Sequence, residues 1–107
     1  MPDIFTIGRG DTLPELSFEL YPPVNLTGAT VVFTMTRSGE TTPVINRRAA
    51  VIAQADPGVV RHDWITGDTA TVGSYLGEFE VTFPNGKIGT YPNTEEKIAI
   101  TVTRSLG

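Results

Sequence analysis

The chain has 107 residues. This length fits one domain, because domains hold about 100 to 150 residues and a second core would have no room. Apolar residues make up 39% and charged residues 19% of the sequence, a balance that excludes a disordered chain and a membrane protein. The net charge of −4 argues against DNA or RNA as a partner, because nucleic-acid binding depends on Lys and Arg at the phosphates. We therefore expect one soluble domain over residues 1–107.

The sequence contains no cysteine. Disulfides, a thiolate nucleophile and a zinc site of the cysteine type are therefore excluded. The N-terminus shows no basic stretch followed by an apolar run, and nowhere do about 18 consecutive apolar residues occur. We expect synthesis in the cytoplasm without a classical export signal, and no membrane partner.

Apolar residues alternate with polar ones through much of the chain, which is typical of β-strands with one buried face. The clearest case places Tyr75, Phe79 and Phe83 on one face of a single strand. In chain order, the expected strands lie near residues 4–7, 16–20, 31–36, 43–53, 59–65, 75–83, 87–91 and 98–102.

Turn sequences rich in Gly, Asn and Pro separate these strands at intervals of roughly ten residues. Asn85-Gly86 predicts a two-residue type I′ hairpin. Gly8-Arg9-Gly10-Asp11 predicts the turn between the first two strands. Short strands with regular turns favour an antiparallel sandwich or barrel of about seven to eight strands.

The segment from Asp68 to Tyr75 resembles the turn that enters a late strand in immunoglobulin-like domains. In that motif an Asp caps the turn, and the hydroxyl of a Tyr two residues before a Cys closes the corner. Gly77 stands at the cysteine position here, and Trp64 precedes the turn instead of lying on an early central strand. The pattern favours an all-β fold, an immunoglobulin-like antiparallel β-sandwich.

Candidate catalytic groups are few. His62 and Asp63 are neighbours on a predicted strand, so their side chains would point to opposite faces and would not meet. Glu78 and Glu80 share a face, where two carboxylates suit acid–base work or a cation, but a hydrated sheet surface is the simpler interpretation. We expect no catalytic residue, no metal, no cofactor and no enzyme activity.

Three segments together resemble a known phage family: Phe5 to Thr12, Asn25 to Val31 and Trp64 to Phe79. They are similar to the N-terminal domain of the baseplate upper protein of tailed phages, over nearly the whole chain. The resemblance implies a non-enzymatic virion component with an immunoglobulin-like fold. In that family a longer C-terminal region follows the sandwich, whereas this sequence stops at Gly107. We therefore expect a coating or ring component instead of an adaptor.

The expected function is a structural role in a bacteriophage virion, as capsid decoration or cement or as a tail or baseplate ring component. The expected partners are the major capsid protein or tail and baseplate proteins, with several copies or a symmetric homo-oligomer on the particle. Synthesis would take place in the bacterial host cytoplasm. Phe5, Arg9, Arg47 and Arg48 are the candidate docking residues.

An alternative is a carbohydrate- or receptor-binding module for host attachment. Such a module needs exposed aromatic side chains, and Tyr21, Tyr91 and Trp64 are the available ones.

Overall fold

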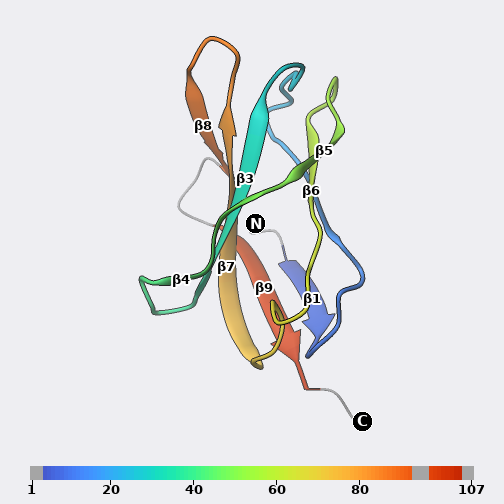
Figure 1. Ribbon diagram of the computed structural model, residues 1–107, viewed down its shortest axis with the longest axis vertical. Coiled ribbons are helices and arrows are strands. Elements are labelled where there is room, and N and C mark those ends of the chain that lie inside the picture. The colour runs from blue at the N-terminus through green and yellow to red at the C-terminus, as the bar shows by residue number, and fades with distance from the viewer. Residues whose placement is uncertain (1–3, 93–96, 105–107) are drawn as a thin grey trace.

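The structure is a computed structural model that describes residues 4–92 and 97–104 (Figure 1). No helix in this part of the chain is long and apolar enough to cross a membrane. The described residues form nine strands: β1 (Ile4–Gly8), β2 (Leu16–Glu19), β3 (Thr30–Arg37), β4 (Pro43–Ala49), β5 (Val51–Gln54), β6 (Val59–His62), β7 (Gly73–Thr82), β8 (Ile88–Tyr91) and β9 (Ile98–Thr103).

The strands form two sheets. The larger has the order β1-β9-β7-β3-β4 with β8 also paired to β7, and the smaller has the order β2-β6-β5. All pairs are antiparallel except β1 with β9. Strand β7 pairs with β3 along one side, and on the other with β9 over its first half and β8 over its second. The two sheets pack as an immunoglobulin-like β-sandwich, which confirms the predicted fold class.

The core lies between the sheets. Alternation along β7 buries Tyr75, Phe79 and Val81 and leaves Leu76 exposed, so the inward face predicted for this strand is confirmed. Phe83 lies just beyond the end of β7, half-buried against the core. The side chains without measurable exposure include Phe33, Phe79, Leu20, Leu26, Met35, Val60 and Val81.

The segment predicted as one strand near residues 43–53 is two strands in different sheets. Between β4 and β5 the amide of Ala50 donates to the Val31 carbonyl at 2.9 Å, and the chain then leaves β3 to pair with β6 (Figure 1). Arg47, at φ 51°, and the register shifts of the β3–β4 pair mark the irregular stretch. A bulge lets a strand bend from one sheet into the other, which a continuous strand does not do.

The predicted type I′ hairpin at Asn85-Gly86 is wrong. Phe83 pairs with Lys87 through a 2.8 Å backbone bond, so the loop has three residues, and Gly86 takes φ 84°. This is the loop in which a turn is followed by a left-handed residue. The physical reason is Pro84, because a two-residue loop needs a backbone N–H at that position to bond to Lys87 and proline has none.

The turn before β7 closes as the sequence predicts. The Tyr75 hydroxyl donates to the carbonyl of Thr71 at 2.6 Å, which is the tyrosine corner of immunoglobulin-like domains. Gly77 faces the core at the position that a cysteine occupies in the immunoglobulin-like motif. A Cβ atom at residue 77 would lie 2.8 Å from the Ile100 side chain and 2.9 Å from the Phe33 ring. These two side chains therefore fill the space that the disulfide of the motif would occupy.

We expect Gly77→Ala to lower the free energy of unfolding by about 1 to 3 kcal/mol, the usual cost of forcing a methyl group into a well-packed core. Ser74→Ala is the matched control, since Ser74 lies on the same strand and is exposed. Urea unfolding followed by circular dichroism measures both variants. Equal stability of the two would contradict the close packing at Gly77.

Candidate functional site

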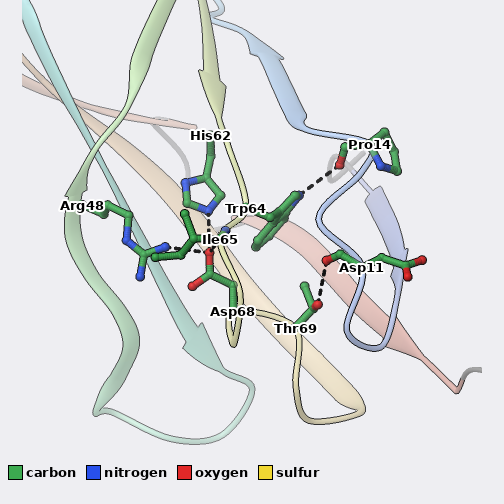
Figure 2. Close-up of polar contacts among 8 residues, drawn as sticks. All are labelled: Asp11, Pro14, Arg48, His62, Trp64, Ile65, Asp68 and Thr69. Atoms are coloured by element: carbon green, nitrogen blue, oxygen red, sulfur yellow. Dashed lines mark hydrogen bonds and ion pairs between the residues drawn. The ribbon is translucent and has the colours of Figure 1, made fainter.

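Two loops lie side by side at one end of the sandwich, residues 9–15 and residues 63–72, which together we call the loop end (Figure 1). The amide of Gly10 donates to the carbonyl of Thr69 at 2.9 Å. The Thr69 hydroxyl, which is buried, donates to the carbonyl of Asp11 at 2.8 Å (Figure 2). Each loop therefore restrains the backbone of the other.

Trp64 makes a third connection between the loops. Its indole Nε1 donates to the carbonyl of Pro14 at 3.1 Å, as Figure 2 shows. The ring is 5% exposed and packs edge-on against Phe33 of the larger sheet at 6.2 Å between centroids. A buried indole of this kind anchors both loops to the core while its N–H remains satisfied.

Asp68 is the polar centre of the loop end. Its Oδ2 atom accepts hydrogen bonds from Arg48 Nη1 at 2.6 Å and from the amide of Ile65 at 2.9 Å (Figure 2). The same oxygen lies 3.6 Å from Nε2 of His62. The Asp68 side chain is 5% exposed, and the contact with Arg48 joins the loop to β4.

His62 is fully enclosed. Its ring stacks on Phe33 at 4.3 Å and meets Trp64 edge-on at 4.6 Å, and neither ring nitrogen has a hydrogen-bond partner within the described residues. Burial lowers the pKa of its imidazole below the ordinary value, and Arg48 lowers it further, whereas the Asp68 carboxylate acts in the opposite direction. His62 is therefore held neutral at neutral pH.

The outer surface of the loop end is apolar in places. Leu13 is 69% exposed and precedes Pro14, which accepts from Trp64. Ile65 is 53% exposed, and its amide donates to Asp68. Arg9 and Asp11 are also exposed and bring one charge of each sign to the same loop. The Gly8-Arg9-Gly10-Asp11 segment is the predicted turn, closed by a 3.0 Å bond from Asp11 to Gly8.

Two of the predicted docking residues lie in or beside the loop end. Phe5 on β1 is half-buried and stacks on Trp64 at 5.9 Å between centroids. Arg9 is exposed at the start of its loop, and its backbone amide donates to Thr103. Their role in docking stays a prediction.

The other two predicted docking residues are held in ion pairs. Arg47 pairs with Glu80 at 2.5 Å on the outer face of the larger sheet, and Arg48 pairs with Asp68. The structure thus separates neighbours in sequence, because the irregular backbone at Arg47 turns the two side chains to different partners.

The two carboxylates considered as a reactive pair each have a cationic partner. Glu78 lies 3.3 Å from Lys97 and Glu80 pairs with Arg47. Glu78 and Lys97 line an open groove of about 350 Å³ on the outer sheet face, together with Thr34 and Leu76. The hydrated surface favoured by the sequence is therefore the better description of this face.

Among known proteins, this chain is matched by a solved structure and not by a family model or a curated protein. A solved structure, CopC from Methylosinus trichosporium OB3b, superimposes with a TM-score of 0.56 at 15% sequence identity, covering 98% of this chain and 88% of CopC. At this identity the likeness shows the fold, the immunoglobulin-like β-sandwich.

This finding corrects the expected function. CopC is a copper-binding protein, and the expectation of a virion structural role, as capsid decoration, baseplate or tail component, is contradicted. The reason the sequence misled is that turn and strand motifs specify a sandwich, and one sandwich carries many functions. The resemblance to baseplate upper proteins itself stays a prediction.

The host-attachment alternative is withdrawn with it. Trp64 is 5% exposed and belongs to the core, so it offers no aromatic platform. Tyr91 is half-buried on β8, and only Tyr21 among the three candidates is open to solvent, at 79%.

The described residues do not fit a copper ion. Copper sites use imidazole and sulfur ligands, and Cu(II) sites also use oxygen ligands. The sequence has one histidine and no cysteine, and Met35 is buried in the core. In the described part of the chain no group of three or more His, Cys, Asp or Glu side chains is placed to hold a metal. The carboxylate nearest His62 is already paired with Arg48, whose charge opposes a cation.

The sequence pointed to part of this site. The Asp68 turn and the Tyr75 corner were predicted, whereas the contact of Asp68 with His62 and Arg48 was not. The one available sign of this contact was the spacing of six residues between His62 and Asp68. His62 ends a strand and Asp68 lies in the turn that follows, so the two side chains can lie close together.

We expect Asp68→Asn to destabilise the protein by about 2 to 4 kcal/mol, because it leaves Arg48 without its carboxylate and weakens the bond to Ile65. Asp63→Asn is the control, since Asp63 pairs with Arg61 at the surface and its loss has a small effect. Thermal unfolding of both variants measures the difference. Equal melting temperatures would rule out a structural role for Asp68.

We expect the free energy of unfolding to fall as pH decreases below about 6.5, the pKa of an unfolded histidine. The pKa of His62 is lowered in the folded protein, so the unfolded chain takes up a proton first and acid favours unfolding. The slope is at most about 1.4 kcal/mol per pH unit for one proton. Urea titrations between about pH 8 and pH 5 measure it, and His62→Phe removes it. A wild-type stability that does not change over this range would contradict the buried neutral imidazole.

Proposed function

We propose that this protein is a non-catalytic interaction module that associates with a second copy of itself through the loop end. The observation that carries the proposal is the exposure of Leu13 and Ile65 on loops that hydrogen bonds hold in place. Exposed apolar side chains on ordered loops are typical of binding surfaces, because loops on a rigid scaffold present the contacting groups.

The rigidity of the two loops favours the binding of a partner. Trp64, Thr69 and Asp68 fix the two loops before any partner arrives. A loop that is already ordered loses little conformational entropy on binding, so more of the energy of apolar burial appears as affinity. Burial of one side chain such as Leu13 is worth about 1.5 to 3 kcal/mol.

The charges of the loop end favour a second copy of this chain as the partner. Arg9 and Asp11 are exposed on the same loop and carry opposite signs. In a two-fold symmetric contact the same patch meets itself, so Arg9 of one copy faces Asp11 of the other, and the reverse. The apolar residues Leu13 and Ile65 would lie within the same contact.

The chemistry of the described residues supports a role without catalysis. His62 is 1% exposed and Asp68 is 5% exposed, so the pair that resembles a base and its carboxylate does not reach a substrate. Glu78 and Glu80 are neutralised by cations on an open face. An acid–base site requires groups within reach of a bound reactant.

We expect the wild-type protein to dimerise with increasing concentration, and Leu13→Ser or Ile65→Ser to weaken the dimer about tenfold or more, since each removes an apolar side chain worth over about 1.4 kcal/mol. Sedimentation velocity over a concentration series measures the dissociation constants. The variants should keep their stability because both side chains are exposed.

Ile88→Ser is the matched control. Ile88 is 63% exposed on β8, at the opposite end of the sandwich (Figure 1), so its loss should leave the dimer unchanged. A wild-type protein that remains monomeric at every concentration would overturn the proposal. Equal weakening by Ile88→Ser would show that association is not specific to the loop end.

A further inference from the structure

His62 is a buried titratable group that the proposed docking surface does not itself use. It lies between Phe33 and Trp64, whose rings approach it to 4.3 Å and 4.6 Å. Neither ring nitrogen finds a hydrogen-bond partner within the described residues. A buried polar side chain without partners costs stability, so such a group in a packed core calls for an explanation.

The surroundings of the His62 ring disfavour its protonated form. The charged groups that act on it are Asp68 of the loop, Arg48 of β4 and, more weakly, the adjacent surface residue Asp63. Asp68 Oδ2, 3.6 Å from His62 Nε2, favours a proton on the ring, but it already accepts from Arg48 and from the Ile65 amide, and the loss of solvation on burial outweighs it. Protonated His62 would place a second cation beside Arg48, and its Nδ1–H would have no hydrogen-bond partner among the described residues.

The same residues hold the loops. Asp68 fixes the turn of residues 63–72 through the Ile65 amide, and Trp64 both contacts the His62 ring and donates a hydrogen bond to Pro14 of the other loop (Figure 2). A shift that relieves charge at His62 therefore disturbs both loops. Local opening of a loop costs less than global unfolding, because it leaves the sheets paired.

We propose that His62, Asp68 and Arg48 form an acid-sensitive latch: it is closed at neutral pH, and a proton on His62 opens it and loosens the loop end. The consequence for the dimer rests on the proposed function, since a loosened loop end no longer presents Leu13 and Ile65 in a fixed arrangement. A free histidine titrates at about pH 6.5, and burial lowers the pKa of His62, so the latch opens as the pH falls below about 6.5.

Trp64 reports the latch directly, because it is the single tryptophan of the sequence and touches His62. We expect its fluorescence emission to move to longer wavelength, and its quenching by acrylamide to rise, between about pH 8 and pH 5. The far-UV circular dichroism of the sheets should not change over this range. His62→Phe keeps the stacking on Phe33 and should abolish the fluorescence transition. Loss of the dichroism together with the fluorescence change would overturn the latch, because it would mean that the whole domain unfolds.

A second measurement needs no variant. The amide of Ile65 donates to Asp68, so its hydrogen-exchange protection factor should fall about tenfold or more over the same pH range, while amides of β3 and β7 keep theirs. An Ile65 protection factor that follows those of β3 and β7 at every pH would overturn the proposal, even if His62→Phe does not fold.

Sedimentation at the same pH values separates the two proposals. A dimer at neutral pH with no fluorescence or exchange transition means that the latch is wrong and the proposed function stands. A transition in a chain that is always monomeric means that the latch stands and the proposed function is wrong. Both proposals together predict that the wild-type dimer weakens as the transition proceeds, and that the His62→Phe dimer does not.

Discussion

The packing of Phe33 is the constraint on which the rest of the structure depends. This ring has no measurable exposure and lies between the sheets, 4.9 Å from Phe79 of its own sheet and 4.3 Å from His62 of the other. Gly77 beside it has no side chain, and the space that a methyl group would need is occupied by the Phe33 ring and Ile100. The Phe33 ring therefore fills the space beside Gly77 of its own sheet and packs directly on His62 of the other sheet.

The aromatic cluster also decides where the loops lie. His62 ends β6 over Phe33, and Trp64 follows edge-on, so the chain enters the turn at a fixed angle. Asp68 then meets His62 and Arg48, and the hydrogen bond from Trp64 to Pro14 secures the second loop. Core, polar junction and exposed surface form one continuous set of contacts. A change in charge at its centre is thus able to reach the surface.

The likeness to CopC separates architecture from chemistry. The two chains share a sandwich over nearly their whole lengths at 15% identity, yet the donor groups that copper requires are not assembled in the described part of this chain. A sandwich needs alternating apolar residues and suitable turns, which many sequences provide. Its loops and faces are free to differ, and function follows those residues. The residues of the loop end are therefore a better basis than the fold for inferring the function of this protein.

Local patterns in the sequence determined the strand content, the inward face of β7 and the tyrosine corner at Tyr75, because alternation and turn motifs act over a few residues. The hairpin type at Pro84 was also open to prediction, since proline has no N–H for the shorter loop. Only the tertiary structure decided that residues 43–53 divide between two sheets, that Asp68 meets His62 and Arg48, and that Leu13 remains exposed. These features depend on contacts between residues far apart in the chain, such as Trp64 with Pro14 at a separation of 50 residues. No local pattern encodes which distant side chain fills a given space.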